Sequence, residues 1–167
     1  MHSTPVIKRS LSMGVGLAAF VACFTVWAPA APGAPGSATD QVIGLTNAQR
    51  AKAGCPALRA DTRLTRAAQA HSSDMAARGV LSHNSSAGDP GARIRAVGYS
   101  ARGWAENIAS GQRGPSEVVD AWMRSPGHRA NILNCGLRDI GVGLAQGRNG
   151  TPYWTQDFGI SNPSRAS

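Results

Sequence analysis

The sequence predicts an α+β domain, in which helices precede an antiparallel β-hairpin near the end of the chain. Apolar side chains recur at helical spacing between Asp61 and Arg78, which indicates an amphipathic helix. Two apolar runs of strand length, residues 140–145 and 153–158, are separated by a short turn that contains Asn149-Gly150. Because helices and antiparallel strands are segregated along the chain, the α+β class is favoured.

The first thirty residues have the features of a secretory signal peptide. Lys8 and Arg9 precede an uncharged run over residues 11–27, and Ala28-Pro29-Ala30 supplies small residues where a signal peptidase cleaves. The run is shorter than the roughly 20 apolar residues that a membrane-spanning helix needs, and further prolines follow it. We therefore expect cleavage after residue 30 and an extracellular or envelope-associated protein with no membrane span.

The cysteines are consistent with export. A lipoprotein anchored through Cys23 is the less favoured alternative, because Phe20 suits a lipoprotein signal poorly and the apolar run continues past the cysteine. Removing the leader leaves Cys55 and Cys135, for which a disulfide is expected in an oxidising compartment. A bridge over about 80 residues would destabilise the unfolded chain by ~4 kcal/mol. Two buried free thiols are the alternative.

The charge balance favours anionic partners other than nucleic acid. Removing Lys8 and Arg9 from the 17 basic residues leaves 15 against 9 acidic residues, a net charge of +6. The arginines are scattered and no aromatic-interleaved basic patch occurs, so nucleic-acid binding is not expected. Anionic wall polymers or lipid headgroups are suitable partners. A merely solvated cationic surface is the alternative.

The helices are expected in order along the chain. Residues 31–40 form a flexible lead-in rich in Ala, Pro and Gly. Thr39 or Asp40 caps a first helix that reaches about Ala53. Asp61 caps the second helix, and Gly79 ends it after Arg78. Shorter helical segments are expected at residues 92–97, 116–124 and 128–133.

Strands are expected at three places. Residues 104–109 join the two strands of the hairpin, 140–145 and 153–158. Gly141 and Gly143 lie in a strand pattern, which indicates close backbone packing. The bulky aromatic side chains of these segments are expected to pack in the core: Trp104, Trp122, Tyr153 and Trp154.

Three short stretches carry side chains able to bind metal or transfer protons. They are LSH ending at His83, AENIASG with Glu106 and SPGHRANIL with His128. Gaps of about 20 residues separate them, so only the fold can bring them together. They therefore predict a cavity lined by His83, Glu106 and His128 rather than a local motif.

Together with IGVGLA and YWTQDFG, these stretches carry a family resemblance. From about Val42 to Gly159 the sequence resembles the CAP superfamily (cysteine-rich secretory, antigen 5 and pathogenesis-related-1; SCP-like), in particular its small secreted bacterial members. The resemblance implies an α/β/α sandwich with a small antiparallel sheet flanked by helices. It places the CAP domain at residues 41–160, followed by a tail at 161–167.

The resemblance also implies roles for the cleft. In metal-loaded relatives, two histidines and two glutamates line it; His83, Glu106 and His128 match three of them. Ser125 stands near the place of the second glutamate, so the set is incomplete. Two neutral imidazoles and a carboxylate can hold Zn²⁺ or another divalent cation. A hydrogen-bonded polar cluster is the alternative, and His71 is interpreted as a core histidine.

The sequence leaves the function open among binding, catalysis and a structural role in the cell envelope that involves no small ligand. The leading hypothesis is a non-catalytic module that binds a cell-envelope polymer, a lipid or a protein. The alternative is a metal-dependent hydrolase or protease, with His83 and His128 as ligands and Glu106 as general base. A carboxylate pair formed by Glu106 with Asp139 or Asp157 would resemble a glycosidase, but their separation cannot be derived from sequence. The oligomeric state is not predicted.

Overall fold

The computed structural model describes residues 36–162. The predicted signal peptide, Cys23 and most of the predicted tail lie outside these residues. Within them, no helix combines the length and the apolar character that crossing a membrane requires.

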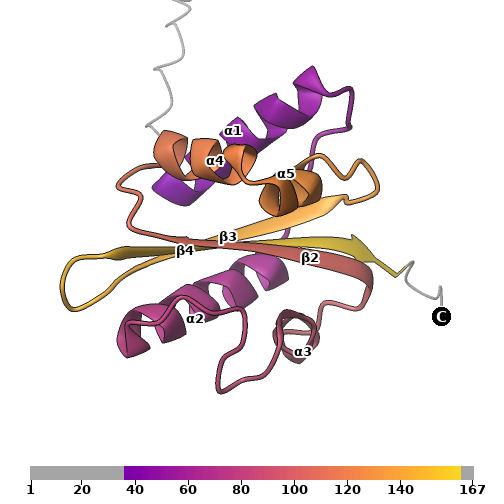
Figure 1. The fold of residues 1–167 in the computed structure, drawn as a ribbon. Coiled ribbons are helices and arrows are strands. Elements are labelled where there is room, and N and C mark those ends of the chain that lie inside the picture. The colour runs from indigo at the N-terminus through magenta and orange to yellow at the C-terminus, as the bar shows by residue number, and fades with distance from the viewer. Residues whose placement is uncertain (1–35, 163–167) are drawn as a thin grey trace, which may run out of the picture. The chain divides into compact units, whose positions relative to one another are not determined.

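A sheet lies between two layers of helices (Figure 1). One face is covered by α1, α4 and α5, and the other by α2 and α3. This arrangement confirms the predicted α/β/α sandwich. In chain order the elements are α1 (Ala38–Lys52), β1 (Arg59–Ala60), α2 (Thr62–Arg78), α3 (Pro90–Ala96), β2 (Ala101–Ser110), α4 (Pro115–Arg124), α5 (Pro126–Ile132), β3 (Asp139–Gln146) and β4 (Pro152–Ser161).

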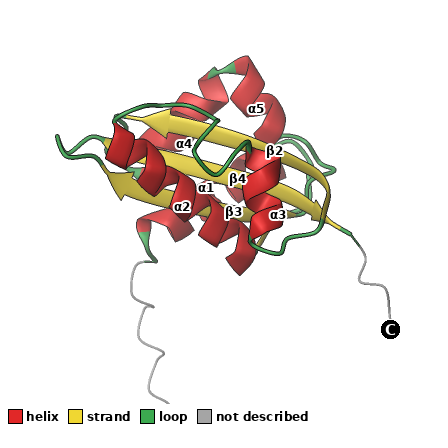
Figure 2. Cartoon of the chain, turned by 90° about the horizontal axis from the view of Figure 1, so that it is seen from below, coloured by secondary structure: helices red, strands yellow, loops and turns green. Residues whose placement is uncertain are grey.

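The sheet has the strand order β1-β3-β4-β2, so β2 lies at an edge (Figure 2). β3 and β4 form the expected antiparallel hairpin, and β2 pairs antiparallel with β4. β1 was not predicted, because it contains only two residues, and it pairs parallel with β3. The sheet is therefore mixed rather than purely antiparallel.

The second helix, α2, begins and ends where local chemistry predicts. The Asp61 side chain accepts hydrogen bonds from the backbone N–H groups of Arg63 and Leu64, which have no partner inside the helix. Gly79 ends the helix in a left-handed conformation with φ 67°. Both signals lie next to the helix in sequence, so tertiary contacts are not needed to find them.

The first helix begins earlier than predicted. Ser37 is the N-cap, and its side chain exchanges hydrogen bonds with Asp40 in a capping box. Asp40 is thus the third helical residue rather than the cap, and the helix begins at Ala38, inside the predicted lead-in.

The larger part of the core lies between the sheet and the layer of α1, α4 and α5, around Trp122, Trp154 and Phe158. Trp104 is an exception to the expected packing, because 45% of it is exposed. It lies on the edge strand β2 against Gly91 of α3, where an added Cβ would be 2.9 Å from the indole nitrogen. No further element covers its outer side in the described residues.

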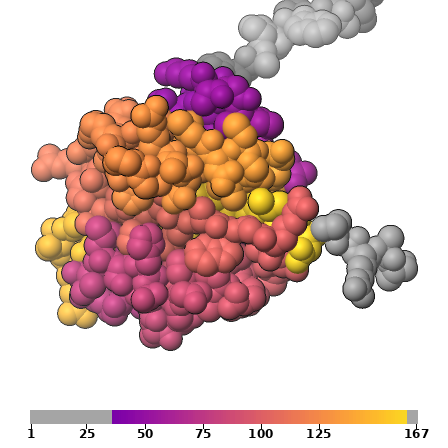
Figure 3. Space-filling model, turned by 45° about the vertical axis from the view of Figure 1, so that its right-hand side comes forward, coloured from indigo at the N-terminus to yellow at the C-terminus, as the bar shows by residue number. Residues whose placement is uncertain are grey.

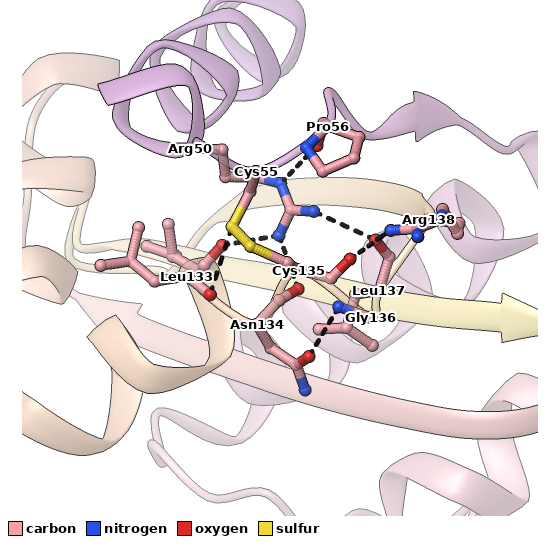
Figure 4. The surroundings of a disulfide bond; sticks show 10 residues. Arg50, Cys55, Pro56, Leu133, Asn134, Cys135, Gly136, Leu137 and Arg138 are labelled. Carbon is pink, nitrogen blue, oxygen red and sulfur yellow. Dashed lines mark hydrogen bonds between the residues drawn. A yellow bond between two sulfur atoms is a disulfide. The ribbon is translucent and has the colours of Figure 1, made fainter. Parts of the chain in front are cut away.

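The predicted disulfide between Cys55 and Cys135 is present (Figure 4). It joins the turn after α1 to the loop before β3. Beside it, the buried Arg50 side chain donates hydrogen bonds to four backbone carbonyls on both sides of the bridge, those of Pro56, Ile132, Asn134 and Leu137. These bonds satisfy a charged group that has been removed from water.

Candidate functional site

Glu106 on β2 is the centre of the site, and its carboxylate is fully engaged. Oε1 lies 2.7 Å from Nδ1 of His83, and Oε2 accepts a hydrogen bond from Nη2 of Arg93 at 2.5 Å. The Glu106 side chain is only 1% exposed. The structure thus brings together two of the three predicted residues, His83 and Glu106, with a third that the sequence did not indicate.

Arg93 fastens the loop that carries His83. Its other terminal nitrogen, Nη1, donates to the backbone carbonyls of His83 at 2.7 Å and Gly88 at 2.8 Å. The guanidinium is buried, so Glu106 is its counter-ion and these carbonyls are further acceptors. One side chain therefore sets both the charge of the site and the path of residues 83–88.

A second acid, Asp157, faces Glu106 from the neighbouring strand. The two residues are paired across β2 and β4, so their side chains lie on the same face of the sheet. Burial, followed by the nearby charge of Glu106, raises the pKa of Asp157 well above its usual range. A protonated Asp157 can donate its proton to the Glu106 carboxylate, which an ionised one cannot do.

His71 completes the buried cluster from α2. Its Nε2 lies 4.0 Å from Oε1 of Glu106, and the side chain is fully buried. Burial is the main cause that lowers the pKa of His71, against the opposing effect of Glu106. A neutral imidazole is therefore expected at pH 7. The predicted core position of His71 agrees with this burial, although its closeness to the site was not foreseen.

His128 approaches the site from the opposite helix layer, on α5. Burial lowers the pKa of His128, and the nearby His83 lowers it further. The His128 backbone carbonyl accepts a hydrogen bond from Asn107, which lies next to Glu106 on β2. Within residues 36–162, no hydrogen bond joins His128 to Glu106.

A hollow of about 250 Å³ lies beside His128. Its walls are apolar at Leu81, Ile108 and Trp122, and polar at Ser125 and His128. Ser125, the residue near the place of the second glutamate, thus faces this hollow. Glu106 and His83 are not part of its walls. The three residues of the predicted cleft therefore do not share one hollow. His128 lines the hollow, whereas the Glu106 carboxylate is buried inside the protein.

A larger hollow of about 690 Å³ lies between α1 and the start of α4. Its walls include Gln41, Leu45, Pro115 and Glu117. None of the predicted site residues lines it.

The residues present do not fit the predicted metal site. Glu106 is poorly placed as a direct ligand, because its side chain is 1% exposed and its charge is paired with the Arg93 cation. Only the imidazoles of His83 and His128 remain as donors, and a Zn²⁺ site normally has at least three protein ligands. In the described part of the chain, no group of three or more His, Cys, Asp or Glu side chains is arranged to hold a metal ion.

The sequence did not indicate that two residues, Arg93 and Asp157, would pack around the Glu106 carboxylate. Arg93 lies in a short helix whose other arginine, Arg95, is exposed, and the sequence does not distinguish them. Asp157 was considered as a partner of Glu106, and its position inside the predicted strand 153–158 was the available signal. The other candidate, Asp139, lies elsewhere, bound to Arg59 and Tyr99.

The fold is a small sandwich domain with one disulfide and a polar cluster around Glu106. Histidines of both helix layers lie at this end of the sheet. Residues 43–158 match the model of CAP, the cysteine-rich secretory protein family. The chain belongs to this family.

Similar proteins occur in bacteria. Protein YkwD of Bacillus subtilis is 41% identical over 129 residues, which cover 77% of this chain and 49% of that protein. An extracellular SCP-domain protein from Bacillus anthracis is 30% identical with a TM-score of 0.70, over 74% of this chain and 40% of that one. An outer surface protein from Borrelia burgdorferi has the same fold, with a TM-score of 0.69 and 22% identity over 74% of this chain and 92% of that one. The chain spans about half the length of YkwD.

Proposed function

We propose that this protein is an extracellular CAP domain that binds a ligand in the hollow beside His128 and does not catalyse a reaction there. The observation that carries this proposal is the state of Glu106: its side chain is 1% exposed, and both its oxygens are bound. A general base must come within hydrogen-bond reach of the proton that it removes. A carboxylate held by a guanidinium inside the protein is poorly placed for that role.

The hollow supports binding of part of a larger ligand. Ligand sites typically have about 300–1,000 Å³ and combine apolar walls with a few polar groups. The hollow beside His128 is slightly smaller and has the same composition, with Leu81 and Trp122 on one side and Ser125 and His128 on the other. It suits one sugar unit, one peptide side chain or a short acyl segment of an envelope component.

Three observations support an extracellular location. The sequence begins with a predicted signal peptide, and the domain has a disulfide, which is typical of oxidising compartments. The Bacillus anthracis protein with the same fold is described as extracellular. Association with the envelope itself is part of the proposal.

Thermal unfolding with candidate ligands tests the proposal, using soluble peptidoglycan fragments, phosphatidylglycerol micelles and a neutral detergent. A ligand at 100 times its Kd stabilises the folded state by about 2.7 kcal/mol, which raises Tm by roughly 8 °C for a domain of this size. We expect Leu81→Ser to abolish the shift. Leu45→Ser, a matched change at the other hollow, should retain it.

Two outcomes would contradict the proposal. Loss of the shift in Leu45→Ser but not in Leu81→Ser would move the ligand to the hollow between α1 and α4. No shift with any probe would favour a structural role without a small ligand.

The second candidate is a metal-dependent hydrolase or protease that uses the same cleft. His83 lowers the pKa of His128, so the two imidazoles lie within electrostatic range, and imidazole is a common metal ligand. Calorimetric titration with Zn²⁺ distinguishes the two candidates. We expect heats equal to dilution for the wild type; saturable binding that His128→Ala removes would support the second candidate.

A further inference from the structure

Five exposed or half-exposed arginines lie on β1, near the start of α2, near the end of α3 and near the start of β2. We call them the arginine face: Arg59, Arg63, Arg66, Arg95 and Arg102. Figure 3, in which the right-hand side of Figure 1 comes forward, shows α3 and the start of β2 beside the end of β4 on one surface. This face lies at the opposite end of β2 from the hollow beside His128.

Contacts around Tyr99 hold several of these arginines together. The Arg63 guanidinium lies over the Tyr99 ring, 4.9 Å from its centre. Arg66 donates to the carbonyl of Val97 at 3.2 Å, two residues beyond Arg95. Side chains that are already positioned lose less entropy on binding than free ones.

The acids of this region do not neutralise the face. Asp61 is used as the α2 cap and by Arg63, and Asp139 is buried between Arg59 and the Tyr99 hydroxyl. Two acids against five arginines leave a surplus of three positive charges. Of the described carboxylates, none lies within 4.0 Å of the cationic groups of the remaining three arginines, Arg66, Arg95 and Arg102. Asp89 caps the other end of α3.

We propose that the arginine face binds an anionic polymer with repeated phosphate groups. Guanidinium groups bind phosphate oxygens in pairs, and several of them at intervals match a chain of phosphates. The four large exposed hydrophobic residues of the described chain are Leu45, Val80, Leu81 and Trp104, and none belongs to the face. Trp104 is the nearest, and its ring lies against Gly91 of α3. The face therefore fits a soluble or wall-attached polymer better than a membrane.

The inference depends on the proposed function in one respect only, the extracellular location of the polymer. The face and the hollow beside His128 do not share residues, so each can fail alone. Leu81→Ser should leave polymer binding unchanged, and loss of the arginine face should leave the thermal shift by a hollow ligand unchanged.

Fluorescence anisotropy with labelled inorganic polyphosphate tests the inference on the chain from residue 31. The variant replaces Arg66, Arg95 and Arg102 by Gln, and a matched control replaces Arg113, Arg124 and Arg148 by Gln, which removes the same charge elsewhere. We expect the first variant to weaken binding by about tenfold or more at low salt and to reduce the slope of log Kd against log salt by about two. The control should lose about threefold or less.

Three results would overturn the inference. They are absence of polyphosphate binding by the wild type, equal losses in the two variants, and tighter binding to phosphatidylglycerol vesicles than to polyphosphate with the same dependence on the arginine face. Thermal melting of both variants checks that they fold. If the first variant does not fold, the single changes Arg95→Gln and Arg102→Gln replace it, each expected to weaken binding by about twofold to threefold.

Discussion

At the scale of single residues, Glu106 shows how a candidate catalytic group can be a structural one. Its residue type and its neighbours in sequence predict a cleft acid, and its carboxylate does lie 2.7 Å from Nδ1 of His83. Its charge, however, is matched by Arg93, and its second oxygen is bound by His83. A buried charge is tolerated when it is paired and hydrogen-bonded. Arg93 and His83 provide that pairing without a metal ion.

Asp157 gives the site a predictable dependence on pH. The folded state raises its pKa above the unfolded value of about 3.9, so its contribution to stability is present below pH ~4 and is lost as pH rises further. Asn resembles the protonated acid and does not ionise. Asp157→Asn should therefore be more stable than the wild type at pH 8, with a smaller advantage at pH 4. Urea unfolding of both proteins between pH 4 and pH 8 measures this difference in the free energy of unfolding.

The control for this prediction is Asp74→Asn, at an exposed i,i+4 pair with Arg78. It should change stability by less than about 0.5 kcal/mol at either pH. A wild type that is more stable than Asp157→Asn at pH 8 would show that the carboxyl of Asp157 is ionised in the folded protein.

At the scale of elements, α2 lies against β3 so closely that only glycine fits. A Cβ at Gly141 would lie 2.1 Å from backbone atoms of Leu64 and Thr65, and one at Gly143 would lie 2.4 Å from those of Ala68. The obstructing atoms are backbone, so no side-chain rotation can relieve the contact. This close packing brings α2, and with it His71, next to the buried acids.

Gly143→Ala should therefore destabilise the domain by about 2 kcal/mol or more, because the helix must move away from the sheet. Gly44→Ala is the matched control, since Gly44 lies within α1 and has no atom within 4 Å of an added Cβ. This control should stabilise the protein by about 0.5–1 kcal/mol. Equal effects in urea unfolding would contradict the close packing.

Which elements could be predicted depends on how local their signals are. The ends of α2 follow from Asp61 and Gly79, which act on the neighbouring backbone. The start of α1 was misplaced, because both Ser37 and Asp40 suit a cap and only geometry separates them. β1 exists through its pairing with β3 and has no pattern of its own.

At the scale of the whole molecule, the site depends on contacts that no local pattern contains. Glu106 and Asp157 meet because β2 and β4 pair in one register, and a slip of one residue would place them on opposite faces. His83 and His128 come from opposite helix layers. The sequence motifs indicated which residues matter, but not that Arg93 would neutralise Glu106 or that the carboxylate would be buried.

The disulfide also acts at the scale of the whole molecule, because it joins two cysteines that are 80 residues apart in the sequence. Replacing both Cys55 and Cys135 by Ala should destabilise the protein by about 2–5 kcal/mol, since the unfolded chain gains freedom. Arg50 retains its four carbonyl acceptors in that variant, so the fold should persist. Calorimetry of the oxidised, reduced and double-Ala proteins measures the effect; an unchanged Tm would show that the bridge contributes nothing.

The stability of Glu106→Gln tests the central claim, that the Glu106 carboxylate is a structural counter-ion rather than a catalytic group. Gln leaves the Arg93 cation buried without its partner, so we predict a loss of about 3 kcal/mol or more in the free energy of unfolding. The exposed control Glu117→Gln should change it by less than about 0.5 kcal/mol. A Glu106→Gln protein as stable as the wild type, or more stable, as is often found when a strained catalytic residue is removed, would contradict the account.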